Sequence, residues 1–481
     1  MPRCLNVFRR ETTIPSKEGE IVMVKKKVTV EELLEKAKRP SKLALVYHPF
    51  YEGKVQVMPK CAIRSPADFA IWYTPGVAAN CRKIKDTPEE VWTQTNRANY
   101  VAVVSDGTRV LGLGDIGPEA AMPVMEGKAL LFKYLGGVDA FPICLNTKDP
   151  DEIVRVCQLI EPTFGGINLE DIEKPKCFHV LEKARENLQI PVWHDDQQGT
   201  ATVILAGLIN ALKIVGKKPS ETLVTFVGVG AANTRTAYVL FRAGFKPGNI
   251  LLVDTNGILY AGRSDLEEEK KENPWKYELA QKTNAEGRTG NIEESFKGVD
   301  VVVAASKPGP GTIKKDWVSQ MATKSIIFAC ANPIPEIWPW EAKEAGAKIV
   351  GTGRSDFPNQ INNSLGFPAI FRGVLDVRAK TVTDDMCVAA ANELARFAEE
   401  RGINENDIAP RMEEWEVFPR VAVACALQSI KEGVARVKPS KQELWERAVA
   451  IIKNARESTR LLMKQGLIKQ PPPEKEILSS P

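Results

Sequence analysis

The feature that most constrains the fold is an alternation of short apolar runs with helix-length segments, which begins at about Gly199. Such runs, rich in β-branched residues and separated by helical patterns, are typical of parallel strands that are buried on both faces. The runs are LVTFVGVG, NILLVD, VDVVVAA, SIIFACANP and AKIVGTG. The alternation therefore predicts a doubly wound α/β domain of Rossmann type over residues 199–363.

Two glycine-rich segments are candidates for a nucleotide-binding turn. GLGDIG, residues 112–117, matches GxGxxG fully, whereas GVGAAN, residues 228–233, ends in asparagine. A dinucleotide fingerprint requires a strand, a tight turn, a helix and a second parallel strand that ends in an acid. The first segment follows a predicted hairpin and precedes Pro118, so it does not form a simple strand–helix–strand unit. The second segment has the whole unit, in the order LVTFVGVG, AANTRTAYVLFRAG and ILLVD.

The segment at residues 228–233 is therefore predicted to bind a nicotinamide dinucleotide. Its first glycine permits the turn, its second lets the backbone approach phosphate, and the amides of the following helix favour negative charge. Asparagine replaces the third glycine, whose role is close packing of helix on strand, so it affects geometry more than binding. Asp254 is expected to accept hydrogen bonds from the ribose hydroxyls. The predicted cofactor-binding residues are Gly228, Gly230, Ala231, Ala232, Asn233 and Asp254.

Two acidic pairs, Glu170-Asp171 and Asp195-Asp196, are candidates for one cleft, and the second directly follows a predicted strand. Convergent carboxylates with little histidine or cysteine nearby suit a hard divalent ion such as Mg²⁺ or Mn²⁺ and not zinc. Adjacent side chains diverge, so one aspartate of a pair can bind metal while its neighbour orients a base. Each pair alone is more often a solvated loop or a helix cap. We expect His194, beside the second pair, to be a packed structural residue.

Two further side chains have both a chemical and an ordinary interpretation. Lys128 lies near the start of a helix predicted to open at Pro123, and a partly buried lysine there could have a lowered pKa and act as a base. A surface lysine is the ordinary alternative. Tyr73, which precedes a Thr-Pro turn, could likewise be only a packing residue.

The rest of the chain is predicted to form four more segments around the nucleotide domain. VAVVS and TRVLGL, joined through Asp106-Gly107, indicate an antiparallel hairpin in a mixed α/β domain that would bind substrate and metal. After Ser364 helical periodicity resumes, and we expect these helices to return to the mixed domain. The predicted boundaries are an N-terminal extension at 1–40, the substrate and metal domain at 41–198, C-terminal helices at 364–469 and a flexible tail at 470–481.

The charge balance excludes some classes of partner. The formal net charge is +4, with 65 basic and 61 acidic residues, so no global field recruits nucleic acid or an anionic membrane. The sequence shows no apolar run of the roughly 18 residues that span a bilayer, and its start lacks the apolar core of a secretory signal. We therefore expect a cytoplasmic protein with a small-molecule substrate.

Taken together, the motifs resemble the malic enzyme family, and in particular its short microbial form. They occur in the family's order from about Ala44 to Arg436, and the ordered set is far more specific than any one member. The motifs are YTPGVA, DGTRVLGLGDIG, MPVMEGKALLFK, NLEDI, HDDQQGTA, VGVGAAN, ANPIPE and PNQINNSLGFPAIFRG. The resemblance implies oxidative decarboxylation of malate to pyruvate and CO₂, with hydride transfer to NAD(P) and a divalent metal.

The resemblance also implies roles for single residues. Lys128 matches the family's catalytic base and Tyr73 its acid, while Asp195 matches the acid that orients the base. Arg109 matches the arginine that binds a substrate carboxylate, for which a bidentate guanidinium is suited. The remaining matches are Glu170, Asp171 and Asp196 as metal ligands, and Asn332 and Asn363 as amides near substrate, Asn332 also near the nicotinamide.

Two alternatives and one ambiguity stay open at this point. A 2-hydroxy acid dehydrogenase that does not decarboxylate would use a histidine–aspartate pair and no carboxylate cluster. A nucleotide sensor without turnover would more naturally lack the lysine or one of the carboxylates. Asp254 favours NAD on charge grounds, whereas Arg263 could reach the 2′-phosphate of NADP. Family members imply a homodimer or homotetramer.

Overall fold

The computed structural model describes residues 11–15, 21–25 and 30–479, which form two compact units. The first unit combines the N-terminal residues to Lys54 with the chain from Leu462 onward. It contains the antiparallel strands β1 (Glu11–Pro15) and β2 (Ile21–Lys25) and the helices α1 (Val30–Tyr51) and α18 (Glu474–Ser479).

The C-terminal tail differs from the prediction of a flexible segment. It forms α18, which packs against α1, and Tyr51 donates its hydroxyl to the carbonyl of Lys469 at 2.7 Å. A second tyrosine, Tyr47, donates to the carbonyl of Pro472 at 3.2 Å. Pro472 has no backbone N–H, so its backbone offers only the carbonyl that Tyr47 uses.

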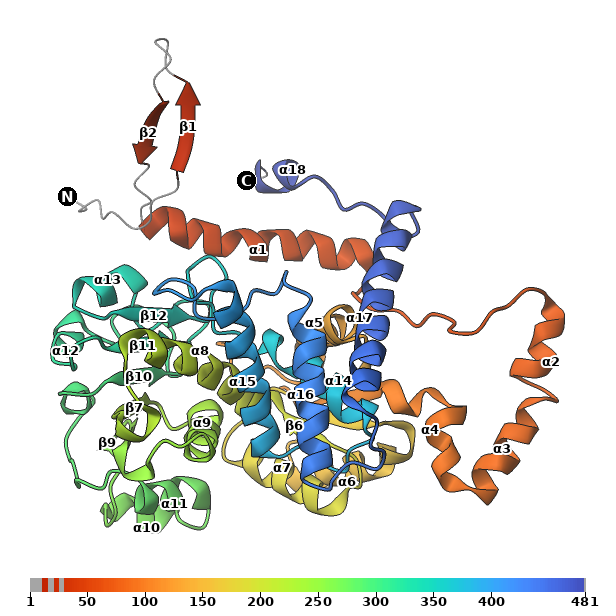
Figure 1. The fold of residues 1–481 in the computed structure, drawn as a ribbon, viewed down its shortest axis with the longest axis horizontal. Coiled ribbons are helices and arrows are strands. Elements are labelled where there is room, and N and C mark those ends of the chain that lie inside the picture. Colours follow the sequence, from red (N-terminus) through yellow and green to blue (C-terminus); the bar gives the residue numbers. More distant parts are fainter. Residues whose placement is uncertain (1–10, 16–20, 26–29, 480–481) are drawn as a thin grey trace. The chain divides into compact units, whose positions relative to one another are not determined.

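The second unit, residues 55–461, whose ribbon is drawn in Figure 1, holds the site and contains a parallel sheet in the order β4-β3-β5-β6. Its strands are β3 (Tyr100–Ser105), β4 (Asp139–Cys144), β5 (Gly166–Leu169) and β6 (Val192–His194). The connecting helices are α5 (Pro118–Gly136), α6 (Pro150–Ile160) and α7 (Lys176–Asn187). This sheet forms the core of the predicted substrate domain.

The predicted hairpin at Asp106-Gly107 is wrong. β3 pairs in parallel with β4 on one side and β5 on the other, and only an isolated antiparallel bridge joins Val110 to Gly114. Because β3 is buried on both faces, it is an inner strand of a parallel sheet, for which a continuous apolar run is typical. The Asp-Gly turn instead starts a loop, within which Asp106 accepts from Thr108.

The segment with the full GxGxxG pattern also differs from expectation. β3, α5 and β4 form a strand–helix–strand unit, with GLGDIG in the long loop that joins β3 to α5. The helix begins at Pro118 and not at Pro123, because proline is well suited to the first turn of a helix. The strand–helix–strand unit is therefore present here, and the loop differs from a phosphate-binding turn in its length.

The predicted doubly wound domain is confirmed as a sheet of order β12-β11-β10-β7-β8-β9. Every neighbouring pair is parallel except the short edge pair β8–β9. Its strands are β7 (Val224–Val227), β8 (Ile250–Asp254), β9 (Gly257–Ile258), β10 (Val301–Ala304), β11 (Ile326–Ala329) and β12 (Ile349–Thr352). Its helices are α9 (Ala231–Arg242), α10 (Ser264–Glu269), α11 (Pro274–Lys282), α12 (Lys315–Val318) and α13 (Pro339–Glu344). The strand order reverses at β7, which is where such sheets bind nucleotides.

The helix α8 (Thr200–Val215) connects the two sheets. Together with the preceding turn, this helix (residues 195–215) is long and apolar enough by composition to cross a membrane. No such run was expected from the sequence. However, 78% of that window is buried inside the protein, as expected for the core helix of a folded domain.

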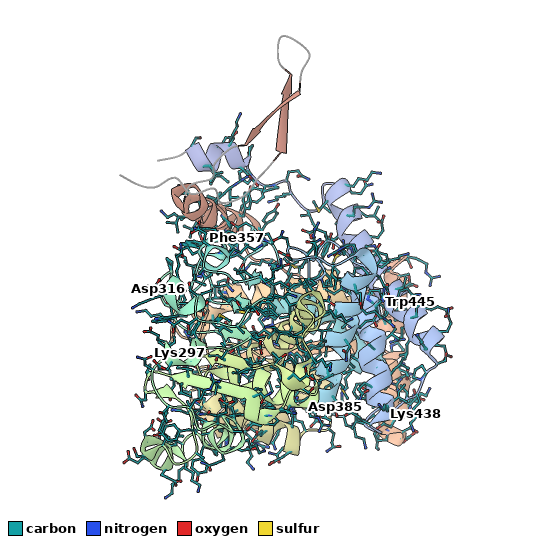
Figure 2. The ribbon with its side chains drawn as sticks, turned by 60° about the vertical axis from the view of Figure 1, so that its left-hand side comes forward. Lys297, Asp316, Phe357, Asp385, Lys438 and Trp445 are labelled. Carbon is teal, nitrogen blue, oxygen red and sulfur yellow. The ribbon has the colours of Figure 1, made fainter. Side chains whose placement is uncertain are left out.

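Four C-terminal helices complete the second unit, and side chains fill the space between helices and sheets (Figure 2). They are α14 (Phe367–Asp376), α15 (Asp384–Arg401), α16 (Val417–Lys431) and α17 (Lys441–Lys464). α14 packs on α5 of the first sheet, whereas α15 packs on α8 and α9. The C-terminal helices therefore contact the helices of the nucleotide domain as well as those of the substrate domain.

An arm at residues 55–95 extends from this unit (Figure 1). It contains the short helices α2 (Phe69–Trp72), α3 (Val77–Asp86) and α4 (Val91–Gln94). Large apolar side chains on the arm are uncovered by the rest of the chain, namely Val57, Met58, Ile63, Phe69, Ile71, Trp72 and Tyr73.

Candidate active site

The two acidic pairs meet because neighbouring parallel strands end side by side. β5 ends at Leu169 and β6 at His194, and these two residues are register partners. Each acidic pair directly follows its strand. The carboxyl ends of parallel strands share one edge of a sheet, so the register alone brings Glu170-Asp171 beside Asp195-Asp196.

Three carboxylates form a compact cluster at this edge. Glu170, Asp171 and Asp196 each offer an oxygen, and these oxygens all lie within 4.8 Å of one another. Burial and the neighbouring Asp196 charge raise the pKa of Asp171 to about 8, and burial raises that of Glu170 well above its usual range. Oδ2 of Asp171 is buried without a hydrogen-bond partner in the described part of the chain. A divalent cation would relieve this repulsion, so the residues fit a hard metal ion.

Lys128 lies between this cluster and Asp195. Its Nζ is 2.9 Å from Oε1 of Glu170 and 2.6 Å from Oδ2 of Asp195, and the side chain is 8% exposed. The ammonium group also makes a cation–π contact with the ring of Phe367, 4.3 Å from the ring centroid. Burial alone would lower the pKa of Lys128, but the charges of Asp195 and Glu170 raise it overall. The expected lowering of this pKa is therefore wrong for the chain without a bound cation.

Asp195 is held in place on every side. Oδ1 accepts from Nε1 of Trp193 at 3.1 Å, and Oδ2 accepts from Nδ2 of Asn363 at 2.5 Å as well as from Lys128. Residues 195–199 form a π-helical turn that leads directly into α8. A Cβ on Gly199 would lie 2.0 Å from Oδ1 of Asp195, so only glycine leaves room for this carboxylate.

His194 has the character of a packed residue, as the sequence reading expected. It is fully buried, and neither ring nitrogen has a hydrogen-bond partner in the part of the chain that the structure describes. Burial lowers the pKa of His194 to about 3, so the ring is neutral at physiological pH. Nδ1 lies 3.7 Å from Oδ2 of Asp196, a distance too long for a hydrogen bond.

The predicted substrate residues Arg109 and Asn332 lie on separate loops, and Arg109 borders the cluster. The backbone amide of Arg109 donates to the carbonyl of Asp171 at 2.9 Å, which places the arginine beside the carboxylates. Its guanidinium is exposed and donates to the carbonyl of Leu111. Asn332 is exposed, and its carbonyl lies 3.5 Å from the position of a Cβ on Gly112. The GLGDIG loop therefore faces the loop after β11.

Sequence reasoning missed the residues that support this group from behind. Trp193 holds Asp195, and Asn168 donates to Oε2 of Glu170 at 2.9 Å. Glu336 is buried and accepts from the backbone amides of Ser306 at 2.9 Å and Ala331 at 3.1 Å, which fixes the loop that carries Asn332. The two-residue period of a strand could have indicated Trp193, which lies two residues before Asp195.

The predicted phosphate-binding turn has an open front. Gly228 has a φ of +94°, and a Cβ there would lie 2.9 Å from the carbonyl of Ala305. A Cβ on Gly230 would meet nothing within 4 Å, and no side chain caps the start of α9. Asn233 is buried and donates from Nδ2 to the carbonyls of Val227 and Gly228 at 3.0 and 2.9 Å. In place of the third glycine, Asn233 thus ties the turn to the helix, and the turn fits a pyrophosphate.

Asp254 ends β8 as expected, but its carboxylate is already engaged. Oδ1 accepts from the amide of Asn256 and from Arg263, while Oδ2 accepts from Arg263 and Lys276 at 2.6 and 2.8 Å. Burial raises the pKa of Asp254, and the hydrogen bonds from Arg263 and Lys276 lower it more, to a net value below the usual range.

Tyr73 is the one predicted catalytic residue that this chain leaves outside the group. It is 70% exposed, and its backbone bonds to Phe69 and Val77 of the same arm. Figure 1 shows α2 and α3 well apart from β6 and α5, which carry the acidic pair and Lys128. The lysine, the carboxylates and Asn363 converge within one chain, whereas Tyr73 does not join them there.

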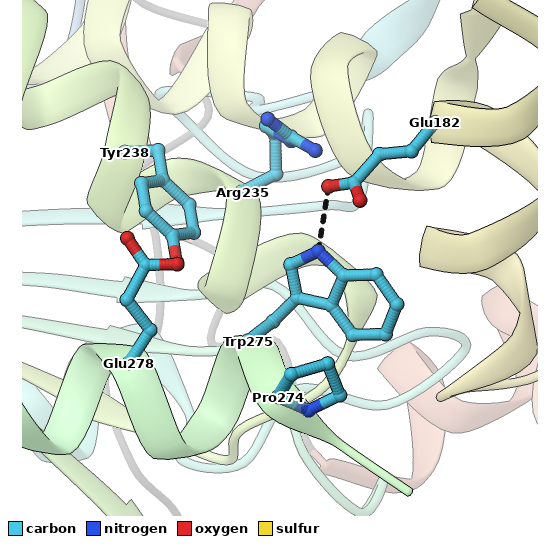
Figure 3. Close-up of a pocket in the computed structure, with 6 residues that line it drawn as sticks. All are labelled: Glu182, Arg235, Tyr238, Pro274, Trp275 and Glu278. Atoms are coloured by element: carbon cyan, nitrogen blue, oxygen red, sulfur yellow. Dashed lines mark hydrogen bonds between the residues drawn. The ribbon is translucent and has the colours of Figure 1, made fainter. Parts of the chain in front are cut away.

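A cavity of about 310 Å³ lies between α7, α9 and α11 (Figure 3). It is lined by Glu182, Arg235, Tyr238, Pro274, Trp275 and Glu278. None of these residues belongs to the carboxylate cluster. Trp275 donates from Nε1 to Glu182 at 2.6 Å, which joins α11 to α7.

Two family models match the sequence and together cover most of it. The model described as malic enzyme, N-terminal domain, matches residues 52–150 and 147–185, and the model described as malic enzyme, NAD binding domain, matches residues 197–431. The boundary between them falls at the second acidic pair.

Individual relatives agree with these matches. The chain is 46% identical over 404 residues to the bifunctional malic/malolactic enzyme of Bacillus subtilis, covering 84% of this chain and 96% of that protein. It is 48% identical over 384 residues to the NAD-dependent malic enzyme of Geobacillus stearothermophilus, covering 80% and 78%. The crystal structure of Entamoeba histolytica malic enzyme superposes with a TM-score of 0.91 at 46% identity, covering 94% of each chain. That of malic enzyme from Pyrococcus horikoshii gives 0.82 at 49% identity, covering 86% and 95%.

Proposed function

The chain belongs to the malic enzyme family, and from this premise we propose how its residues act. It catalyses the oxidative decarboxylation of malate to pyruvate and CO₂ with hydride transfer to NAD(P). The observation that carries the proposal is the position of Lys128, between Glu170 and Asp195 beside the three-carboxylate cluster. A dehydrogenase that only oxidises would need neither this cluster nor a buried lysine.

We propose Glu170, Asp171 and Asp196 as the ligands of Mg²⁺ or Mn²⁺. The mutual repulsion of these carboxylates and the unpartnered oxygen of Asp171 support this assignment. A bound divalent ion would polarise the hydroxyl and carboxylate oxygens of malate. Nδ2 of Asn168 holds Glu170, so this ligand is oriented before any ion arrives.

Lys128 is the proposed base that takes the proton from the C2 hydroxyl of malate. A general base must be deprotonated, and the charges of Asp195 and Glu170 now hold its ammonium form. Neutralising part of this negative charge would lower the pKa of Lys128 toward a working range. Asp195 then orients the amine, and Trp193 and Asn363 hold Asp195.

Arg109, Asn332 and Asn363 are the proposed contacts for substrate. The backbone bond of Arg109 to Asp171 places its exposed guanidinium next to the cluster, where it can take a carboxylate in bidentate form. Asn332 lies on the loop that Glu336 fixes after β11, close to the nucleotide sheet. It is therefore also proposed to contact the nicotinamide.

We further propose that Tyr73 acts as the acid in the site of a second copy of the chain. Support comes from its 70% exposure and from the other apolar side chains that the arm leaves uncovered. Uncovered apolar clusters of this kind mark protein interfaces. A homodimer in which each arm covers the partner would bury these side chains. It would also bring a phenol hydroxyl to a site in which the described residues of its own chain place a base but no such acid.

At the nucleotide turn, the amides at the start of α9 are proposed to hold the pyrophosphate of NAD or NADP. The oxidised nicotinamide supplies the hydride acceptor. Gly228, Gly230, Ala231 and Ala232 form the approach to the pyrophosphate, and Asn233 braces it.

One assay tests the proposal as a whole. The protein is given malate, Mn²⁺ and either NAD or NADP, and both reduced nicotinamide and pyruvate are followed. Equal formation of the two products is expected. Reduced nicotinamide without pyruvate would instead support a simple dehydrogenase, and no turnover would support a nucleotide sensor.

A further inference from the structure

The end of β8 is a closed network of charges in which Asp254 has no acceptor position to spare. Each of its two oxygens accepts two hydrogen bonds, from Asn256, Arg263 and Lys276. A carboxylate has about four lone-pair positions. The direct contact to ribose hydroxyls that is typical of NAD-binding acids would therefore require one of these bonds to break.

Arg263 is likewise fully engaged, which rules out its simple use for a 2′-phosphate. Nε and Nη2 donate to Asp265, Nη2 and Nη1 donate to Asp254, and Nη1 also donates to the carbonyl of Gly257. The side chain is 7% exposed. Arg263 thus braces the loop after β8 and is not a free cation at the surface of the crevice.

Two lysines beside this network keep spare donors. Lys276 donates to Asp254 and Glu269, which leaves one N–H of the ammonium group. Lys174 donates from Nζ to the carbonyl of Val229 at 3.1 Å, its one hydrogen bond among the described residues. The two lysines lie close enough that the charge of Lys276, after burial, lowers the pKa of Lys174.

Both lysines border the place where the adenosine ribose of a bound dinucleotide would lie. Lys174 is fixed to Val229, inside the phosphate-binding turn. The next residue back, Gly228, donates its amide to the carbonyl of Val253 at 2.8 Å, one residue before Asp254. In this type of fold the ribose sits between the glycine turn and the acid that ends the second strand. A ribose held there would be flanked by Lys174 on the turn side and by Lys276 on the strand side.

The position of Lys276 does not depend on the ligand. It follows Trp275 in the first turn of α11, and Trp275 donates to Glu182 and packs on Phe178, both of α7 (Figure 3). Because successive helix residues point in different directions, Trp275 anchors the helix to α7 while Lys276 reaches Asp254. The ammonium group is thus held at the end of β8 before any nucleotide binds.

We propose that Lys174 and Lys276 bind the 2′-phosphate of NADP and make the chain accept NADP as well as NAD. The proposal rests on the dinucleotide site proposed above and adds the group that distinguishes the two cofactors. Asp254 then serves to hold Lys276 and Arg263 and no longer repels a phosphate, because its own charge is neutralised. Two ammonium groups with spare N–H donors are what a compact dianion requires.

The test compares ADP-ribose with 2′-phospho-ADP-ribose, two probes that lack nicotinamide, by titration calorimetry on the full chain. The wild-type protein is expected to bind both. Lys174→Ala is expected to weaken 2′-phospho-ADP-ribose about tenfold, as for the loss of one charge-assisted contact, and to leave ADP-ribose within about twofold. Lys276→Met is expected to act in the same direction. Lys271→Ala, an exposed lysine of the preceding segment, is the matched control and should change neither affinity.

Each outcome distinguishes the inference from the function on which it rests. Equal weakening of both probes by Lys174→Ala would overturn the inference, because the lysine would then serve the shared pyrophosphate or only the fold. Tight ADP-ribose binding with no binding of 2′-phospho-ADP-ribose would also overturn it and leave an NAD-specific site. Failure of the wild-type protein to bind either probe would overturn the dinucleotide site itself.

Discussion

Nζ of Lys128 lies 2.6 Å from Oδ2 of Asp195, and both side chains are almost entirely closed to solvent. A buried ammonium–carboxylate contact of this kind is stable only while both partners are present, because a buried charge without its partner is costly. The Lys128–Asp195 pair therefore contributes both to the proposed chemistry and to the stability of the fold. Changes to either residue have to be assessed for both activity and stability.

Replacement of Lys128 by methionine should abolish proton removal from malate while the nucleotide site stays intact. We expect kcat to fall by about two to four orders of magnitude, the usual contribution of a general base. ADP-ribose binding, measured by calorimetry, should not change. Lys133→Ala, on the exposed side of the same helix, is the control, and a comparable loss of kcat in that variant would show that the effect is structural.

Gly199→Ala should displace Asp195 without removing any charged group. The added Cβ would lie 2.0 Å from Oδ1 of Asp195, so the carboxylate has to move away from Lys128. A displacement of this size at a catalytic contact costs on the order of a hundredfold in kcat. Steady-state kinetics and a thermal melt together test this. A variant with normal kcat would mean that the position of Asp195 does not matter for the base.

Mn²⁺ should raise the melting temperature of the protein, and removal of the metal by EDTA should reverse the rise. Binding to the folded state alone stabilises it by about 2.7 kcal/mol when the ion is at a hundred times its Kd. Asp171→Asn should lose most of this effect, since it removes one of the three carboxylates. Asp151→Asn, with a side chain 83% exposed, should keep it.

Two inactive variants should complement each other if Tyr73 acts across a dimer. Mixing Tyr73→Phe with Lys128→Met and allowing subunits to exchange produces hybrids in which one site has both the wild-type lysine and a wild-type arm. Activity should return to a fraction of the wild-type value, measured as pyruvate formation. Native mass spectrometry confirms the exchange. Hybrids that form but stay inactive would place Tyr73 in the site of its own chain or outside the chemistry.

Asp254→Asn should destabilise the nucleotide domain at neutral pH and have little effect in acid. The pKa of Asp254 lies below its ordinary value, so its ion pairs add stability above the unfolded pKa of about 4, and this stability is lost as the pH falls through the folded value. Thermal melts of both proteins at pH 7 and near pH 3 test this sign. A difference that grows in acid would contradict it.

The nucleotide domain could be predicted closely from the sequence because its evidence is local. The alternation of apolar runs and helices, and the strand–turn–helix–strand unit around Gly228, depend only on near neighbours in the chain. The acidic pairs were found for the same reason, since each directly follows a strand. Their convergence, however, depended on the register Leu169–His194, which the sequence alone does not show.

The errors arose where distant contacts override local preference. Asp106-Gly107 has the chemistry of a tight hairpin, but β3 is captured between β4 and β5. The prediction of a lowered pKa for Lys128 took account of burial alone. The charges that raise this pKa belong to Asp195 and Glu170, which follow strands distant in the sequence. The saturation of Asp254 depends on Lys276, which lies 22 positions further along the chain.

The π-helical turn that follows β6 also limits how this protein can vary. Deletion of one residue between Val192 and Asp195 would shift both aspartates back by one position, so that Asp195 would take the place of His194 in the strand and Asp196 that of Asp195. The acid assigned to the ion would then stand where the amine is steadied, and Gln197 would replace it at the ion. Deletions should therefore be tolerated in the loop before β6 and rejected within the strand, a contrast that a library of single-codon deletions can reveal.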